Sequence, residues 1–324
     1  MTTKENLLEL LRERGSLSAS ELADNLDLSR QMIHLTLREL TDAGLIQRIG
    51  RPPKTVYQLK TANILQEVVL PTDQEEFLKK TFVQITETGE IKEGAQGFQL
   101  WCAQRKLPFE KTVNEYLSTL QKYRSYFNAD GFIDGMDKLK STKGYELIYL
   151  DNLFYLDFYA IERFGKTRLG TILHYAKQGQ SKLLMKLLVN ETKQKVAELC
   201  KVIKVDAVGF VPPTIRREVQ LMKYLQTHYA LAQPLIRLNK TSGIIPVPQK
   251  SLNKLEERIS NARQTFSIPE TRKFDHVLLI DDAVGSGATV NEIAGKIKKK
   301  GVAAKVSALA ITGSFKGFDV ITDV

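Results

Sequence analysis

The stretch HVLLIDDAVGSGATVNE (His276–Glu292) combines a buried strand with two acids and a glycine-rich turn. Four apolar residues, Val277–Ile280, lead directly into Asp281 and Asp282. The turn Gly285–Thr289 follows, and a run with helical periodicity comes next. A strand that is apolar throughout is typical of a parallel sheet covered on both faces, and such sheets bind ligands beyond the carboxyl ends of their strands. The stretch therefore predicts an α/β fold with a ligand site at the end of this strand.

The turn and the two acids have the chemistry to bind two ends of one ligand. Backbone N–H groups at the amino end of a helix cradle a phosphate, and the hydroxyls of Ser286 and Thr289 add two donors. The carboxylates of Asp281 and Asp282 can accept hydrogen bonds from a ribose 2′,3′-diol, while Mg²⁺ relieves their mutual repulsion. The pattern therefore predicts binding of a pentose 5-phosphate; the alternative is an acid pair that caps a helix in another α/β fold. The expected phosphate-binding residues are Gly285, Ser286, Gly287, Ala288 and Thr289.

Strands and helices alternate from Lys143 onward, which indicates a parallel sheet with helices on both faces. Tyr145–Gly165 is typical of paired strands, and Val205–Pro213 is typical of a short buried strand that ends in a Pro-Pro turn. Val306–Thr312 predicts a further strand after the one at His276. Helices are expected over 167–190 with a break near Gly179, over 217–229 and over 290–300.

The segment VLLIDDAVGSGAT (277–289) resembles the signature with which type I phosphoribosyltransferases bind 5-phosphoribosyl-1-pyrophosphate (PRPP). That signature is an apolar strand, two acids, two small apolar residues, two hydroxyl residues, glycine, any residue and threonine. Gly285 departs from it by removing one hydroxyl. The resemblance implies that Asp281 and Asp282 take the ribose hydroxyls and are the catalytic residues if the domain is an enzyme. It also implies that loop 285–289 takes the 5-phosphate, and that Mg²⁺ enters with PRPP instead of occupying a separate metal site.

Further segments resemble ComF-like phosphoribosyltransferases. Phe164–Leu184 resembles their early segment, and Val211–Pro213 lies where the family has its pyrophosphate-side loop. Ser251–Ile268 resembles a family loop whose key residues here are Arg258, Asn261 and Phe266. The chain departs from the family in two ways: it lacks the cysteine-rich zinc module, and Glu218–Gln220 replaces a Gly-Phe-Asn sequence. The resemblance covers roughly Lys143 to Thr312.

The first sixty residues have the pattern of three short helices and a hairpin. Ser18 and Glu21 form a capping-box pair that predicts a second helix, and Ser29 is placed to cap a third helix that ends near Ala43. Two alternating strands then surround a basic loop at 50–54. This order resembles the winged helix-turn-helix of bacterial regulators. The inner face of the third helix is expected to be Ile33, Leu37 and Leu40.

The resemblance to a winged helix implies that the third helix enters the major groove of DNA and that the wing contacts its backbone or minor groove. Between residues 28 and 62 there are six Lys/Arg and two Asp/Glu, whereas the preceding residues are net acidic. Positive charge is therefore confined to the expected DNA face; the alternative is a winged helix used only for protein contacts. The expected DNA-binding residues are Arg30, Gln31, His34 and Arg38 on the helix and Arg51 and Lys54 in the wing.

Composition excludes several classes of protein. The chain has 324 residues and a net charge of +10, which favours polyanionic partners. Its start lacks the apolar core of a secretion signal, and its most apolar window, Glu146–Ala160, is interrupted by polar residues, so no membrane span is expected. Cys102 and Cys200 are too few and too far apart for a disulfide framework or a cysteine-only zinc site. We expect a reduced, cytoplasmic protein.

Three parts are expected: a winged helix-turn-helix domain over 1–62, a helical middle segment over 63–142, and an α/β, type I phosphoribosyltransferase-like domain with a parallel sheet over 143–324. In the middle segment, 109–127 has an apolar and aromatic stripe at helical spacing, which predicts a core face or a dimer interface, and Trp101 is expected in a core helix. A homodimer is expected because winged-helix regulators commonly dimerise.

Three functions fit this combination. The first is a transcriptional regulator that binds double-stranded DNA and senses PRPP or a nucleotide. The second is an active phosphoribosyltransferase that transfers phosphoribose from PRPP to a nucleobase. The third is a ComF-like role in DNA uptake or processing. We favour the regulator, because a dedicated DNA reader is an unusual addition to a salvage enzyme.

Overall fold

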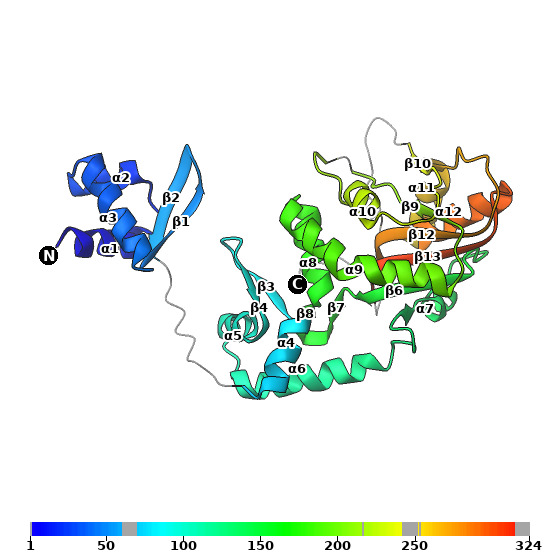
Figure 1. The fold of residues 1–324 in the computed structure, drawn as a ribbon, viewed down its shortest axis with the longest axis horizontal. Helices are drawn as coiled ribbons and strands as arrows, with labels where there is room; N and C mark the ends of the chain where they lie inside the picture. The colour runs from blue at the N-terminus through cyan, green and yellow to red at the C-terminus, as the bar shows by residue number, and fades with distance from the viewer. Residues whose placement is uncertain (1, 60–69, 216, 242–251, 253, 315–324) are drawn as a thin grey trace. The chain divides into compact units, whose positions relative to one another are not determined.

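The computed structural model contains two compact units (Figure 1). The first comprises Met1–Leu70 with Ile85–Ile91, and the second comprises Pro71–Gln84 with Lys92–Val324. The structure describes residues 2–59, 70–215, 217–241, 252 and 254–314. The division into 1–62, 63–142 and 143–324 stays a prediction, and its first boundary lies outside the described residues.

The first unit contains three helices and a hairpin over residues 2–59. They are α1 (Thr3–Arg14), α2 (Ala19–Leu26), α3 (Arg30–Asp42), β1 (Ile46–Arg51) and β2 (Lys54–Leu59). Ser18 Oγ accepts a hydrogen bond from Glu21 N, and the Glu21 carboxylate accepts one from Ser18 N at 2.7 Å, which is the predicted capping box. Ser29 caps α3 as predicted, and β1 pairs antiparallel with β2. The predicted inner face of α3 is buried with Leu7, Leu11 and Leu22.

The second unit begins with a mainly helical region whose elements surround one aromatic core. These elements are α4 (Thr72–Thr81), β3 (Val83–Ile85), β4 (Ile91–Glu93), α5 (Gly94–Gln104) and α6 (Phe109–Arg124). Ile85 and Ile91, at the ends of β3 and β4, belong to the first unit. Phe98 stacks on Trp101 with ring centroids 5.5 Å apart, and Tyr116 from α6 packs edge-on against Phe164 at 5.1 Å. Val113, Tyr116 and Tyr123 of the predicted stripe are buried inside this unit. These residues therefore form a core face, whereas the dimer interface and the homodimer stay predictions.

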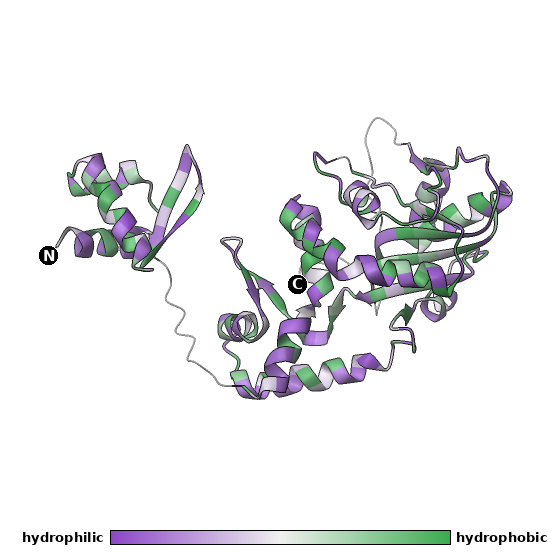
Figure 2. Ribbon diagram, in the orientation of Figure 1, coloured by the Kyte–Doolittle hydropathy of each residue, from purple (hydrophilic) through white to green (hydrophobic). Residues whose placement is uncertain are grey.

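A five-stranded sheet forms the centre of the second unit, in the order β5-β6-β13-β12-β9. The strands are β5 (Ile133–Asp134), β6 (Asn152–Phe158), β9 (Ala207–Phe210), β12 (Phe274–Val284) and β13 (Ala303–Gly313). Strands β6, β13, β12 and β9 run parallel, and β5 is antiparallel to β6. The predicted parallel sheet is confirmed. In Figure 2 apolar residues run through these central strands, as expected when both faces are covered.

Helices cover the two faces of this sheet. They are α7 (Met136–Ser141), α8 (Arg168–Gln178), α9 (Lys182–Val202), α10 (Leu221–Tyr229), α11 (Leu255–Thr265) and α12 (Ala288–Lys299). The crossover from β6 to β9 and the crossover from β12 to β13 run in opposite directions across the sheet. Right-handed crossovers therefore place α8 and α9 on one face and α12 on the other (Figure 1). The small pairs β7–β8 (Ala160–Ile161, Gly165–Lys166) and β10–β11 (Asn239–Lys240, Phe266–Ser267) complete the unit with a 3₁₀ turn, η1 (Glu162–Phe164).

Three expectations for this unit need correction. The main strand of Tyr145–Gly165 has no partner within the segment: β6 pairs in parallel with the distant β13, and local pairing is limited to the short β7–β8 pair at its end. Helix α10 begins at Leu221 and not at Arg217, because Arg217 extends toward the α8–α9 turn. Strand β12 continues beyond Ile280 to Val284.

Candidate functional site: a ligand pocket and a DNA-binding face

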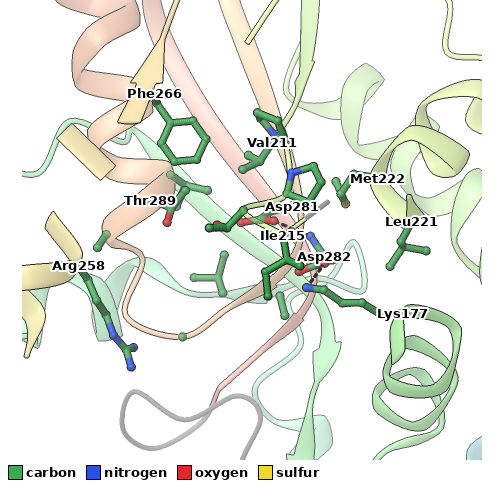
Figure 3. Close-up of a pocket in the computed structure, with 18 of the residues that line it drawn as sticks. Lys177, Val211, Ile215, Leu221, Met222, Arg258, Phe266, Asp281, Asp282 and Thr289 are labelled. Atoms are coloured by element: carbon green, nitrogen blue, oxygen red, sulfur yellow. Dashed lines mark hydrogen bonds and ion pairs between the residues drawn. The ribbon is translucent and has the colours of Figure 1, made fainter. Parts of the chain in front are cut away.

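A pocket lies at the carboxyl ends of β9 and β12 and at the amino end of α12 (Figure 3). Its cavity volume is 220 Å³. The structure brings all seven predicted ligand-binding residues into the lining of this one pocket: Asp281, Asp282, Gly285, Ser286, Gly287, Ala288 and Thr289. The motif at 281–289 thus forms one contiguous part of the pocket wall.

The two acids lie inside strand β12, two residues before its end, and not after it as the sequence suggested. Asp282 is buried and forms an ion pair with the ammonium of Lys177, from the last turn of α8. Asp281 is half-buried, and its Oδ1 accepts a hydrogen bond from the backbone N–H of Asp282 at 2.8 Å. Both carboxylates therefore have a partner within the protein.

Electrostatics make Asp281 unlike an ordinary aspartate. Burial, followed by the negative charge of Asp282, raises the pKa of Asp281 to about 7, while Lys177 and Lys240 oppose that shift. Lys240 lies on β10, and its Nζ donates to Thr214 Oγ1 at 2.8 Å. Burial lowers the pKa of Lys240 to about 8. The charge of a bound ligand, positive or negative, would therefore change the pKa values of Asp281 and Lys240.

The glycine-rich loop is held in one conformation by its surroundings. Gly287 has φ +87°, and a Cβ there would lie 2.7 Å from Leu139 Cδ1. The hydroxyl of Tyr145 donates to the Ser286 carbonyl at 2.8 Å. As the N-cap of α12, Gly287 has no side chain to accept from the first backbone N–H groups, and the Ser286 hydroxyl accepts from Ala288 N only at 3.4 Å. The helix therefore presents backbone donors at the pocket, which suits an anion.

Arginines and apolar side chains form the rest of the wall. Arg217 donates to the Lys177 carbonyl and, at 2.7 Å, to the Gln178 side chain, so it fixes the loop after β9 to the end of α8. Arg258 is buried and donates through Nε to the Leu252 carbonyl at 2.7 Å. The apolar part of the lining includes Val211, Pro212, Pro213, Ile215, Met222 and Phe266.

The segment expected to be a loop around Arg258 and Asn261 is helix α11, and Phe266 starts β11. Arg258 and Phe266 line the pocket, whereas Asn261 is not part of the lining. The sequence did not single out Lys177 or Lys240 as site residues. A lysine in the last turn of a helix or in a two-residue strand has no spacing pattern of its own, so only the fold brings it to the acids.

Mg²⁺ fits this pair of carboxylates only when it arrives with a ligand. In proteins it is usually held by one or two carboxylates together with ligand phosphates and water. Asp281 and Asp282 supply those two carboxylates, and within the described residues no group of three or more potential metal-binding side chains exists. Helix α12 and the two acids thus offer places for a phosphate and for its metal in one pocket.

The expected DNA-binding residues are all exposed on the first unit. Arg30, Gln31, His34 and Arg38 are all exposed on α3, on the side away from its buried residues. Arg30 donates to Ser20 Oγ at 3.2 Å, and Arg38 makes only a long contact of 3.9 Å with Asp42. Arg51 and Lys54 are exposed partners at the tip of the β1–β2 hairpin. These side chains are free to reach a polyanion.

The first unit resembles a known family of DNA-binding domains. Residues 2–47 match the family of winged helix-turn-helix DNA-binding domains, a match that covers α1, α2, α3 and the start of β1. A comparison with curated proteins finds no match to the chain. Among the described helices, none has the length and apolar character needed to cross a membrane. The chain therefore carries an N-terminal winged helix-turn-helix DNA-binding domain.

Proposed function

We propose that the protein is a DNA-binding transcriptional regulator whose second unit senses PRPP or a nucleotide through a ComF-like, type I phosphoribosyltransferase-like domain. The winged helix supplies the DNA reader. The observation that supports a sensor is the meeting of Asp281 and Asp282 with the amino end of α12 in one pocket. Acceptors for a ribose diol, a place for Mg²⁺ and backbone donors for a phosphate are the chemistry of a phosphorylated pentose.

An active phosphoribosyltransferase is the second candidate, and one observation favours it. The pKa of Asp281 is raised to about 7, chiefly by burial, and a carboxyl group that titrates near neutral pH is suited to acid–base chemistry. Such an enzyme would also rely on positioning and electrostatic stabilisation of an oxocarbenium-like centre. Release of pyrophosphate when PRPP and a nucleobase are supplied would identify this function.

The proposal is tested by calorimetry of PRPP binding in the presence of Mg²⁺. We expect millimolar or tighter binding by the wild type. The Asp281→Asn/Asp282→Asn variant keeps the shape of the pocket but loses charge-assisted hydrogen bonds and metal contacts, so binding should weaken by about 2–4 kcal/mol. Asp275→Asn is the matched control, because Asp275 is an exposed acid on the same strand. Equal PRPP binding by the wild type and the double variant would refute the assignment of the pocket.

A further inference from the structure

Two apolar residues of α3 are exposed among polar ones, Met32 at 46% and Leu35 at 55%. Gln31, Leu35 and Arg38 follow one another at i, i+4 and i+7, so they form one stripe along the helix. This stripe lies opposite the buried side of α3, which is formed by Ile33, Thr36, Leu37 and Leu40. Leu35 is 55% exposed and occupies the centre of the stripe.

A leucine at this position is not required by the fold. The winged-helix core is closed without it, since the core of the first unit is formed by other residues, and Leu35 lies outside that cluster. Among the exposed residues around it, Gln31, His34 and Arg38 all offer hydrogen-bond donors, and the acid Glu39 is paired with Lys4 at 2.9 Å. An apolar group within an otherwise polar and negatively charged surface would therefore complement Leu35.

The major groove of DNA contains one group of that kind. Guanine, cytosine and adenine present only hydrogen-bonding atoms to the groove, whereas thymine also presents its C5-methyl group. A recognition helix places the residues of its amino-terminal part against base edges, and Leu35 belongs to the first half of α3 (Arg30–Asp42).

We propose that Leu35 contacts the C5-methyl group of a thymine and makes this protein require a thymine at one fixed position of its DNA site. The inference rests on the proposed DNA-binding function. Gln31 lies one turn before Leu35 and Arg38 one turn after it, so the thymine falls within the recognised sequence and not at its flank.

The test removes the methyl group from the DNA. A double-stranded site is first selected with the full chain from a randomised library, and each thymine in turn is then replaced by deoxyuridine. At one position the wild type should lose about fourfold in Kd, which corresponds to the burial of one methyl-sized group. Leu35→Ala should bind the thymine and deoxyuridine forms of that site equally. Its binding to unselected DNA should match that of the wild type, since the phosphate contacts are unchanged.

Leu183→Ala is the matched control, because Leu183 is a 67% exposed leucine on helix α9 of the second unit. This variant should retain the fourfold effect of deoxyuridine. If the wild type binds its selected site but tolerates deoxyuridine at every position, or if Leu35→Ala remains sensitive, the role of Leu35 is refuted while DNA binding stands. A concentration-dependent dimer that Leu35→Ala dissociates, again without sensitivity to deoxyuridine, would assign Leu35 to a contact between copies of the chain. Absence of any duplex binding would overturn the proposed function together with this inference.

Discussion

The ammonium of Lys177 forms an ion pair with the carboxylate of Asp282, so the protein itself supplies a cation to one of the two acids proposed to hold Mg²⁺. A free divalent ion must displace Lys177 before it can use both acids. Two kinds of metal binding should therefore differ. A metal ion alone competes with Lys177 for Asp282. A metal ion that arrives with a phosphorylated ligand does not, because the phosphates offer the lysine another partner.

Replacing Lys177 with methionine should increase affinity for metal alone. We expect about a tenfold gain in Mn²⁺ binding at pH 8 in the absence of PRPP, because one charge-assisted contact contributes on the order of 1.5 kcal/mol. Electron paramagnetic resonance of free Mn²⁺ measures this directly. Lys186→Met changes an exposed lysine on α9 and should leave Mn²⁺ binding unchanged. Identical Mn²⁺ binding by all three proteins would show that Lys177 does not block the acids.

Asp281→Asn should stabilise the protein in a pH-dependent manner. The folded-state pKa of Asp281 is raised to about 7, so above pH 7 the folded protein holds a buried charge that the unfolded chain exposes to water. The wild type should therefore lose stability relative to the variant as pH rises from 5 to about 7, with a constant difference above that. A difference on the order of 2 kcal/mol is expected in urea unfolding at pH 8. A variant that is less stable than the wild type at pH 8 would contradict this account.

The same titration should govern ligand binding. An ionised carboxylate binds Mg²⁺ and accepts a charge-assisted hydrogen bond from a ribose hydroxyl more strongly than a protonated one, so PRPP affinity should fall as pH is lowered from 8 to 6. Calorimetry at matched ionic strength measures this fall. An ordinary aspartate would produce no change in this range, because it stays ionised down to about pH 4. Constant affinity between pH 6 and pH 8 would thus exclude Asp281 from the binding step.

Gly287→Ala should distort the glycine-rich loop by a steric clash, in addition to the strain of placing alanine in a left-handed backbone conformation. A left-handed residue other than glycine costs about 1 kcal/mol wherever it occurs. At Gly287 the added Cβ would also lie 2.7 Å from Leu139 Cδ1, whereas Gly131, with a similar φ of +79°, has no neighbour within 4 Å. PRPP affinity should therefore drop in Gly287→Ala and remain at the wild-type value in Gly131→Ala. Equal affinities in the two variants would mean that the loop does not contact the ligand.

Wing residues should contribute affinity without sequence preference. Arg51→Ala or Lys54→Ala should weaken binding to all duplexes alike and reduce the slope of log K against log salt by about one, because one phosphate contact is lost. Gln31→Ala should instead lower the ratio of specific to random binding. Arg12→Ala, which changes an exposed arginine on α1, is the control. A fragment of residues 1–62 without DNA affinity at low salt would assign the unit to protein contacts.

The features predicted correctly from the sequence are those that depend on residues close together in the chain. The capping box at Ser18 and the order of apolar strands each follow from short-range rules, and the motif from Asp281 to Thr289 keeps its site residues contiguous. The partners of those residues come from elsewhere: Lys177 is more than one hundred positions away, and nothing in its own helix marks it.

Net charge does not reveal where individual lysines point. In the lysine-rich segment at the end of α12, Lys298 pairs with Asp151 at 2.8 Å and Lys300 donates to the Ile268 carbonyl at 2.6 Å. These lysines hold the second unit together. Such pairings depend on tertiary structure, which composition does not report.

A regulator requires that the two sites be coupled, whereas an enzyme with an appended DNA reader does not. Coupling of about 1–3 kcal/mol would change affinity for the selected duplex by roughly 5- to 150-fold when PRPP is added, and DNA would change PRPP affinity by the same factor. Fluorescence anisotropy with saturating PRPP and Mg²⁺ measures the first effect, and calorimetry with duplex present measures the second.

PRPP is itself a polyanion that competes for the basic face of α3, so salt of equal ionic strength must replace it in the control. The effect should persist against that control in the wild type and vanish in Asp281→Asn/Asp282→Asn. Unchanged DNA affinity, together with pyrophosphate release from PRPP and a nucleobase, would favour the enzyme, because ligand binding in the pocket would then have no effect on DNA binding by the winged helix.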